Sequence, residues 1–255
     1  MSRLIIVSNR VQPPTGEGGG NQGGLAVALS AALRESSGIW FGWSGESTEQ
    51  FTGHINLRRA FGVTTATVDL EEQDVDEYYN GYANRTLWPL FHYRVDLAEF
   101  ESGFAEGYER VNRRFADTLQ PLVEEDDLIW VHDYHMFPLG RFLRDRGVRN
   151  RMGFFLHIPW PPYRLLMSLP DHRELVETLF AYDVVGFQTQ DSLEAFHDYV
   201  VHEMGGTVEE DGRVVVGERS VLARACPIGI DTDNFLEAAR SPAAKDAFDR
   251  MRESA

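Results

Sequence analysis

Short apolar runs alternate along the chain with segments in which apolar residues recur every three or four positions. The runs predict strands buried in a parallel sheet, at residues 4–7, 39–43, 64–70, 128–131, 152–158, 183–188 and 220–230. The periodic segments predict helices, at residues 25–35, part of 71–83, 106–119, 137–146, 175–182 and 192–204. A hairpin is predicted around Asp211-Gly212, and a polar helix over residues 233–252. This alternation of strands and helices indicates an α/β fold with a mainly parallel sheet.

Composition narrows the class of protein. The 255 residues include 40 acidic and 24 basic ones, for a formal net charge of -16. Nucleic acids are recognised mainly through positive charge, so we expect no nucleic-acid partner. The net negative charge does not exclude a small anionic substrate, because a few arginines at the binding site can outweigh the charge of the whole chain. Cys226 is the only cysteine, which excludes an intramolecular disulfide, and its apolar neighbours predict a structural role.

The N-terminus enters an apolar strand directly and lacks the features of a signal peptide. No apolar run approaches the roughly 18 residues of a membrane span. We therefore expect a cytoplasmic protein that has no membrane partner.

A glycine-rich stretch, residues 16–24, separates the first predicted strand from the next helix. Glycines let backbone N–H groups approach a phosphate, and the helix N-terminus adds a partial positive charge. The stretch has neither the Walker A sequence nor the dinucleotide-binding spacing. From spacing alone, a phosphate-binding loop and an ordinary surface loop are equally compatible with it.

Polar residues follow several predicted strands, where parallel sheets gather their ligands. Arg10 could pair with a phosphate, although a lone arginine is more often a surface residue. Asp133 could accept hydrogen bonds from sugar hydroxyls, and His157 is either a core histidine or a donor in a cleft. Asp133 with His132 and His135 could suggest a metal trio. Their spacing is not that of a helical metal site and no fourth ligand is indicated, so we expect no metal.

Aromatic residues cluster between positions 78 and 93, among them Tyr79, Trp88 and His92. Flat aromatic faces stack on sugar rings, while core packing is the more frequent role of such residues.

Taken together, these segments resemble a known family. The motifs, in order, are Val7-Ser8-Asn9-Arg10, Gly23-Gly24-Leu25-Ala26, Trp40-Phe41-Gly42-Trp43-Ser44-Gly45, Glu77-Tyr78-Tyr79-Asn80, Leu87-Trp88-Pro89, Phe91-His92-Tyr93, Trp130-Val131-His132-Asp133-Tyr134-His135, Gly153-Phe154-Phe155-Leu156-His157-Ile158-Pro159 and Pro227-Ile228-Gly229-Ile230. The series resembles the N-terminal portion of the trehalose-6-phosphate synthases, which are retaining glucosyltransferases.

The resemblance implies the N-terminal domain of a GT-B glycosyltransferase, a Rossmann-like parallel sheet with helices on both faces. Residues 1–230 would form this acceptor-binding domain, and residues 231–255 a helix leading toward a nucleotide-sugar domain. The implied acceptor is glucose 6-phosphate and the donor a nucleotide-glucose, usually UDP-glucose. No metal or other cofactor is implied, and the oligomeric state, a homo-oligomer included, stays open.

The resemblance also assigns roles to the acceptor side. Arg10 would grip the acceptor phosphate, and Tyr79 and Trp88 would shape the acceptor pocket. Asp133 would hold acceptor hydroxyls near the reaction centre. Either Trp40 or Trp43 would line the pocket.

On the donor side, Gly23 and Gly24 would bring backbone N–H groups to the diphosphate, and His157 would bond the donor glucose. Asp133 and His157 are thus the expected catalytic residues. The family's Asp-Arg-x-Asp-Tyr-x-Lys-Gly motif, which binds the donor phosphates, is absent. The missing motif leaves open a non-catalytic sugar-phosphate-binding lobe or subunit. A related transferase that uses glycerol 3-phosphate as acceptor is a separate alternative.

Two local departures accompany the missing motif. Trp160-Pro161-Pro162-Tyr163 and Cys226 stand where the family has Phe-Pro and Tyr, and neither carries an implied role.

Overall fold

A computed structural model describes residues 3–11, 38–60, 62–229 and 232–253 of the chain. The strands are β1 (Leu4–Arg10), β2 (Ile39–Thr48), β3 (Asn56–Ala60), β4 (Val63–Glu71), β5 (Leu128–His132), β6 (Met152–Leu156), β7 (Val184–Phe187), β8 (Thr207–Val208), β9 (Arg213–Val216) and β10 (Arg219–Ala225). They form one sheet in the order β3-β4-β2-β1-β5-β6-β7-β10-β9-β8. Neighbours from β4 to β10 run parallel, and β3, β9 and β8 join antiparallel at the two edges.

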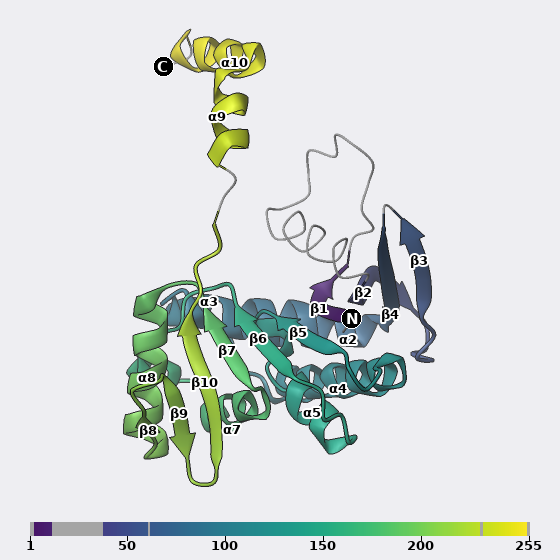
Figure 1. The fold of residues 1–255 in the computed structure, drawn as a ribbon, viewed down its shortest axis with the longest axis vertical. Helices are drawn as coiled ribbons and strands as arrows, with labels where there is room; N and C mark the ends of the chain where they lie inside the picture. Colours follow the sequence, from purple (N-terminus) through teal and green to yellow (C-terminus); the bar gives the residue numbers. More distant parts are fainter. Residues whose placement is uncertain (1–2, 12–37, 61, 230–231, 254–255) are drawn as a thin grey trace.

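Helices and helical turns connect these strands (Figure 1). They are α2 (Glu72–Asp74), η1 (Val75–Leu87), α3 (Trp88–Phe91), η2 (Val95–Leu97), α4 (Ser102–Leu119), η3 (Gln120–Leu122), η4 (Tyr134–Met136), α5 (Leu139–Asp145), α6 (Tyr163–Leu166), α7 (His172–Glu177), η5 (Thr178–Ala181), α8 (Gln190–Met204), α9 (Thr232–Arg240) and α10 (Pro242–Glu253). The predicted α/β fold with a mainly parallel sheet is confirmed.

Burial on both faces of the sheet explains why the strands are continuous runs of apolar residues. In β1, Ile5 and Val7 belong to a large buried cluster, while Ile6 belongs to a smaller one. Because successive strand residues point to opposite faces, β1 is covered on both sides. The predicted inward residues of α4 are buried as its helical period requires; they are Tyr108, Val111, Phe115 and Leu119.

Several segments differ from the sequence prediction, and three of them have a clear physical reason, while the helix predicted over residues 25–35 lies outside the described residues. The β3 edge strand was not expected, because its side chains are mostly exposed and lack an apolar pattern. The helix predicted over residues 137–146 is shorter: α5 begins after Pro138, and a 3₁₀ turn precedes it. The predicted helix over residues 233–252 is interrupted before Pro242, which starts α10, because proline lacks the N–H that would continue α9.

The C-terminal helices stand apart from the sheet. Figure 1 shows α9 and α10 beyond the carboxyl end of β10, at the end of an extended segment. The predicted boundary at residue 230 lies outside the described residues, and the division into domains stays a prediction. The predicted hairpin around Gly212 is confirmed, with Thr207 opposite Val215.

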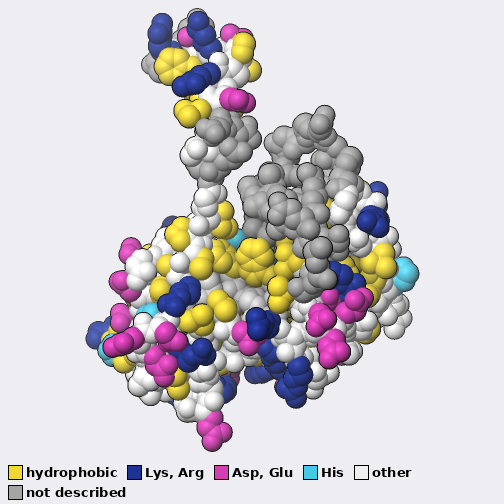
Figure 2. Space-filling view, in the orientation of Figure 1, with side chains coloured by type: hydrophobic (Ala, Val, Ile, Leu, Met, Phe, Trp, Pro, Cys, Tyr) yellow, Lys and Arg dark blue, Asp and Glu magenta, His cyan; other side chains and the backbone are white. Residues whose placement is uncertain are grey.

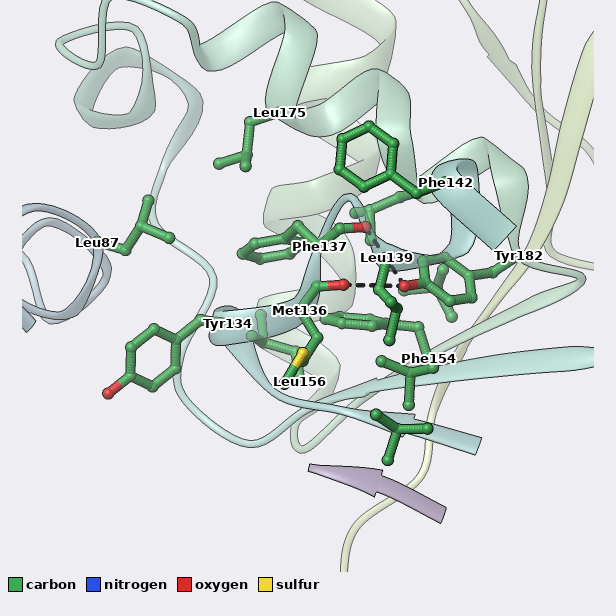
Figure 3. Packing of buried hydrophobic residues seen from close by; sticks show 14 of the residues in the cluster. Leu87, Tyr134, Met136, Phe137, Leu139, Phe142, Phe154, Leu156, Leu175 and Tyr182 are labelled. Atoms are coloured by element: carbon green, nitrogen blue, oxygen red, sulfur yellow. Dashed lines mark hydrogen bonds between the residues drawn. The ribbon is translucent and has the colours of Figure 1, made fainter. Parts of the chain in front are cut away.

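One buried tyrosine fixes the turn that follows β5. Figure 3 shows the hydroxyl of Tyr182 among the core residues beside η4. This hydroxyl donates to the carbonyl of Met136 at 2.9 Å and accepts from the amide of Gly140 at 2.9 Å. Since these bonds lie in the dry core, they hold the segment after Asp133 in one conformation.

Candidate functional site

The parallel strands bring several polar and aromatic residues to one edge of the sheet. Arg10 ends β1 and pairs in register with Trp43 of β2. Asp133 directly follows β5, and His157 directly follows β6, the next strand in the sheet. These are carboxyl ends, the edge at which open α/β sheets bind ligands. In Figure 2, hydrophobic side chains cross the middle of the molecule, with charged side chains mainly to the sides and below.

Arg10 is an exposed cation at this edge. Its guanidinium carbon lies 5.8 Å from the ring centroid of Trp43. The lack of a side chain at Gly45 leaves room for it, since a Cβ there would lie 2.5 Å from Arg10 Nε. Within the described ranges, Arg10 forms no ion pair with an acidic residue. The guanidinium fork therefore lies beside the Trp43 ring, and its charge is available to an anion.

Tyr79 joins the same group of side chains. Its ring centroid lies 5.5 Å from that of Trp43, and it stacks on His135 at 5.9 Å with an interplanar angle of 20°. Tyr79 is half-buried, whereas His135 is buried behind it. Arg10, Trp43 and Tyr79 thus form a continuous wall, supported by His135.

The structure shows which of Trp40 and Trp43, the two candidates for the pocket wall, lies beside the other predicted residues. Trp40 donates its Nε1 hydrogen to Ser8 Oγ at 2.8 Å and packs in the smaller cluster with Ile6 and Val63. Trp43 packs in the larger cluster and contacts Arg10 and Tyr79. Trp43 is therefore the tryptophan of β2 that lies beside the predicted acceptor residues.

Two tyrosines tie η1 to the sheet edge. The hydroxyl of Tyr78 donates to Asn9 Oδ1 at 2.9 Å, and that of Tyr134 donates to Asn84 Oδ1 at 3.0 Å. These bonds fix η1, and with it Tyr79, relative to β1 and η4. Sequence reasoning did not single out these supporting residues; the only signal was their position beside the predicted ones.

Asp133 has an unusual backbone conformation. Its φ of 74° and ψ of 168° lie in a region that essentially only glycine occupies without strain. Its Oδ1 accepts from the backbone N–H of His157 at 3.2 Å, which joins the ends of β5 and β6. Burial raises the pKa of Asp133 to about 6, against the opposing effect of hydrogen bonds from nearby backbone amides. The carboxylate is ionised at neutral pH and available to hydroxyl donors.

His157 pairs with a second imidazole. Its Nε2 lies 3.0 Å from Nδ1 of His132, with the two rings nearly parallel. Burial and the neighbouring His157 lower the pKa of His132 to about 3, and burial lowers that of His157 to about 4. Both rings are therefore neutral at pH 7 and act as hydrogen-bonding groups rather than as cations.

No ring contact joins Trp88 to the other predicted site residues that the structure describes. Its side chain is 45% exposed at the start of α3, and its ring stacks on His92 at 4.1 Å. In the described parts of the chain it has no ring contact with Tyr79 or Arg10. Gly23 and Gly24 lie outside the described residues.

Other sequence inferences can be compared with the structure. No three His, Cys, Asp or Glu side chains of the described segments gather as a metal-binding group. Within those segments, no helix combines the length and apolar character needed to cross a bilayer. Trp160 is buried in the core, whereas Cys226 is exposed, so the prediction of a packed, structural cysteine is wrong. Cys226 directly follows β10, and its backbone N–H donates to the carbonyl of Phe187 at 2.8 Å, so it is the side chain that is exposed.

The chain is similar to known proteins over nearly its whole length. The profile of glycosyltransferase family 20 matches residues 3–255. The trehalose-6-phosphate synthase of Sinorhizobium fredii (strain NBRC 101917 / NGR234) is 48% identical over 256 residues, which covers 100% of this chain and 55% of that protein. The chain thus spans about half the length of the curated relatives it matches.

Solved structures show the same similarity. An α,α-trehalose-phosphate synthase (UDP-forming) from Burkholderia xenovorans, in complex with glucose-6-phosphate, has a TM-score of 0.85 and 48% identity, covering 93% of this chain and 52% of that one. A protein from E. coli bound with UDP-2-fluoro glucose has a TM-score of 0.87 and 42% identity, covering 94% of this chain and 52% of that one.

Proposed function

Since the chain belongs to glycosyltransferase family 20, we propose that it binds glucose 6-phosphate and serves the synthesis of trehalose 6-phosphate. Glucose would pass from a nucleotide-glucose, UDP-glucose in our proposal, to glucose 6-phosphate with retention of configuration. The relatives support both substrates, because one was solved with glucose-6-phosphate and another with UDP-2-fluoro glucose. The chain would supply the acceptor side and one wall of the donor site.

The observation that carries the proposal is the wall formed by Arg10, Trp43 and Tyr79. Arg10 offers a fixed guanidinium fork without an ion-pair partner among the described residues, which suits a phosphate. Tyr79 stands beside it with an aromatic face and a hydroxyl, which suit a sugar ring and its phosphate. Trp88 is proposed as a further wall of the acceptor pocket.

The ends of β5 and β6 would orient the reacting groups. The Asp133 carboxylate accepts hydrogen bonds from acceptor hydroxyls, and the neutral imidazole of His157 bonds the donor glucose. The backbone amides of Gly23 and Gly24 are proposed to face the donor diphosphate. These contacts position two substrates in one geometry, which is the main protein contribution to a group transfer of this kind.

In the proposed reaction, the bond between the anomeric carbon of the donor glucose and the diphosphate oxygen breaks. The anomeric hydroxyl oxygen of glucose 6-phosphate bonds to that carbon on the same face, giving the α,α-1,1 linkage. Its proton passes to a phosphate oxygen of the leaving diphosphate. Because the substrate itself receives the proton, neither Asp133 nor His157 has to act as a general base.

Calorimetry with glucose 6-phosphate, glucose and glycerol 3-phosphate tests the acceptor site. We expect glucose 6-phosphate to bind more tightly than either of the others, because only it has both the phosphate and the hexose ring. Preference for glycerol 3-phosphate would support the alternative transferase. Failure of all three to bind would contradict the proposal.

A second measurement tests catalysis. UDP-glucose and glucose 6-phosphate are supplied together, and UDP release is followed. We expect little turnover from these 255 residues alone, because cationic groups that stabilise a leaving diphosphate are not among the residues assigned to the site. Turnover restored by a separately expressed C-terminal half of a relative would indicate a split enzyme. Binding without restored turnover would favour a non-catalytic sugar-phosphate-binding lobe.

We further propose a cytoplasmic location, which the proposed substrates support. Sugar phosphates and nucleotide sugars are charged and do not cross a bilayer unaided, so their enzyme has to share their compartment.

A further inference from the structure

His132 and His157 form a hydrogen-bonded pair of imidazoles at the ends of β5 and β6. The Nδ1 atom of His132 lies 3.0 Å from Nε2 of His157, and the ring planes differ by 25°. At this distance, one nitrogen carries the hydrogen and the other accepts it. A neutral imidazole has a single N–H, so the direction of this bond determines the tautomer of both rings.

The surroundings of His132 determine that direction. His132 is 1% exposed, and its Nε2 is buried without a hydrogen-bond partner among the described residues. The rings of Trp130 and Phe155 pack around it, with centroids 4.4 and 6.4 Å away. A hydrogen on Nε2 would be a buried donor with no acceptor, and buried N–H groups of that kind are rare. A hydrogen on Nδ1 makes the bond to His157 and leaves only a lone pair unpaired.

The tautomer of His157 then follows. Because its Nε2 accepts from His132, the single hydrogen of the neutral ring resides on Nδ1. That nitrogen makes no hydrogen bond to any described residue, and the ring is half-buried. The backbone of His157 is held independently, since its N–H donates to Asp133 Oδ1 at 3.2 Å.

We propose that His132 is a positioning residue that fixes His157 as the Nδ1–H tautomer, so that His157 offers a hydrogen-bond donor to a sugar oxygen at the carboxyl edge of the sheet. The identity of the sugar, glucose of the donor, rests on the proposed function, whereas the tautomer does not. His132 itself is too buried to touch a substrate. The opposite tautomer would present a lone pair at Nδ1 and could only receive a hydrogen from a hydroxyl.

Two substitutions of His132 separate this role from simple packing. In His132→Asn, the side-chain Nδ2 occupies a position close to that of the imidazole Nδ1 and can donate to His157. In His132→Asp, which has the same shape as His132→Asn, a carboxylate oxygen occupies that position and can only accept a hydrogen. Long-range ¹H–¹⁵N NMR spectra of the ¹⁵N-labelled chain at pH 7 report which nitrogen of each histidine carries the hydrogen. A His157→Gln variant assigns the His157 signals by their loss.

We expect the Nδ1–H form of His157 in the unsubstituted chain and in His132→Asn, and a hydrogen on Nε2 in His132→Asp, because a carboxylate can only accept. An Nε2–H form in the unsubstituted chain would overturn the proposal. So would an unchanged tautomer in His132→Asp. If His132→Asp does not fold, the unsubstituted chain still decides the matter, because an Nε2–H form there contradicts it.

The experiment needs no sugar, so its failure and that of the proposed function are distinguishable. A chain with the Nδ1–H form that does not bind glucose 6-phosphate would retain this inference and contradict the proposed function. A chain that binds glucose 6-phosphate but has the Nε2–H form would support the proposed function and contradict this inference.

Discussion

The ring of Trp43, near the middle of β2, lies 5.5 Å from the ring of Tyr79 in η1, and the guanidinium of Arg10 packs against the same indole. The end of β1, the middle of β2 and η1 therefore meet at one point. Because each of the three side chains limits the freedom of the next, a ligand that uses Arg10 also meets the two rings. The consequences can be measured residue by residue.

Trp43 and Trp40 provide a matched pair. Trp43→Leu removes the surface against which Arg10 and Tyr79 pack, and we expect glucose 6-phosphate to bind about 3- to 10-fold more weakly. Trp40→Phe removes a hydrogen bond to Ser8 in the other cluster. It should lower the free energy of unfolding by about 1–3 kcal/mol and leave the affinity unchanged. Calorimetry measures the affinity for glucose 6-phosphate, and denaturant unfolding measures the stability. Equal losses of affinity in the two variants would contradict the assignment of Trp43, rather than Trp40, to the acceptor site.

Arg10 should determine the preference for a phosphorylated sugar. Arg10→Ala removes a charge-assisted bond of about 1.5–3 kcal/mol, so we expect glucose 6-phosphate affinity to fall about 10- to 100-fold. Affinity for glucose should hardly change. Arg219 serves as the control, because it begins β10, away from the carboxyl edge, and pairs with Glu177 at 3.3 Å. If Arg219→Ala reduces binding as much as Arg10→Ala, the effect is one of net charge and the assignment fails.

The strained backbone of Asp133 predicts that glycine at this position is more stabilising than alanine, the reverse of the usual order. Asp133→Ala and Asp133→Gly both remove the carboxylate, but only glycine adopts this φ and ψ without strain. We expect the glycine variant to be more stable than the alanine variant by about 1–3 kcal/mol, while both lose acceptor binding. Denaturant unfolding gives the stability difference. An alanine variant of equal or greater stability would show that Asp133 carries no strain.

His135 should limit stability in acid. Burial lowers its pKa to about 3, whereas in the unfolded chain it titrates near its ordinary value of 6.5. The unfolded state thus binds an extra proton between these values, and the chain loses stability as the pH falls from about 6.5 toward 3.

His135→Phe keeps a ring between Tyr79 and Tyr134 and removes the titration. We expect its unfolding free energy to fall less on acidification, by up to about 1.4 kcal/mol per pH unit. Unfolding curves at pH 7 and pH 5 measure this, and parallel losses in both proteins would refute it.

Local sequence pattern was sufficient for the parallel sheet and for the buried face of α4. The reason is that both depend on the local spacing of apolar residues. Ile5, Ile6 and Val111 are apolar and buried, as that spacing predicts. The edge strand β3 escaped prediction because pairing with β4, rather than its own exposed side chains, makes it a strand. The family resemblance and the fold class are confirmed by the comparisons.

The site was only partly predictable. Arg10, Asp133 and His157 follow strands, so topology alone gathers them at one edge. Trp40 and Trp43 are three residues apart in β2 and therefore face opposite sides, but the sequence does not say which side faces η1. The His132 and His157 pair depends on the register between β5 and β6, which no local pattern encodes. The roles of Trp88, Gly23 and Gly24 stay predictions.

The most direct test of the account is to locate glucose 6-phosphate on the chain by NMR. Backbone and indole ¹H–¹⁵N signals are followed as the sugar phosphate is added. We expect the shifts to concentrate at Arg10, the Trp43 indole, Tyr79 and Asp133. Shifts confined to the cavity beside Tyr82 and Asp171, or no shifts at all, would contradict a sugar-phosphate site at the carboxyl edge.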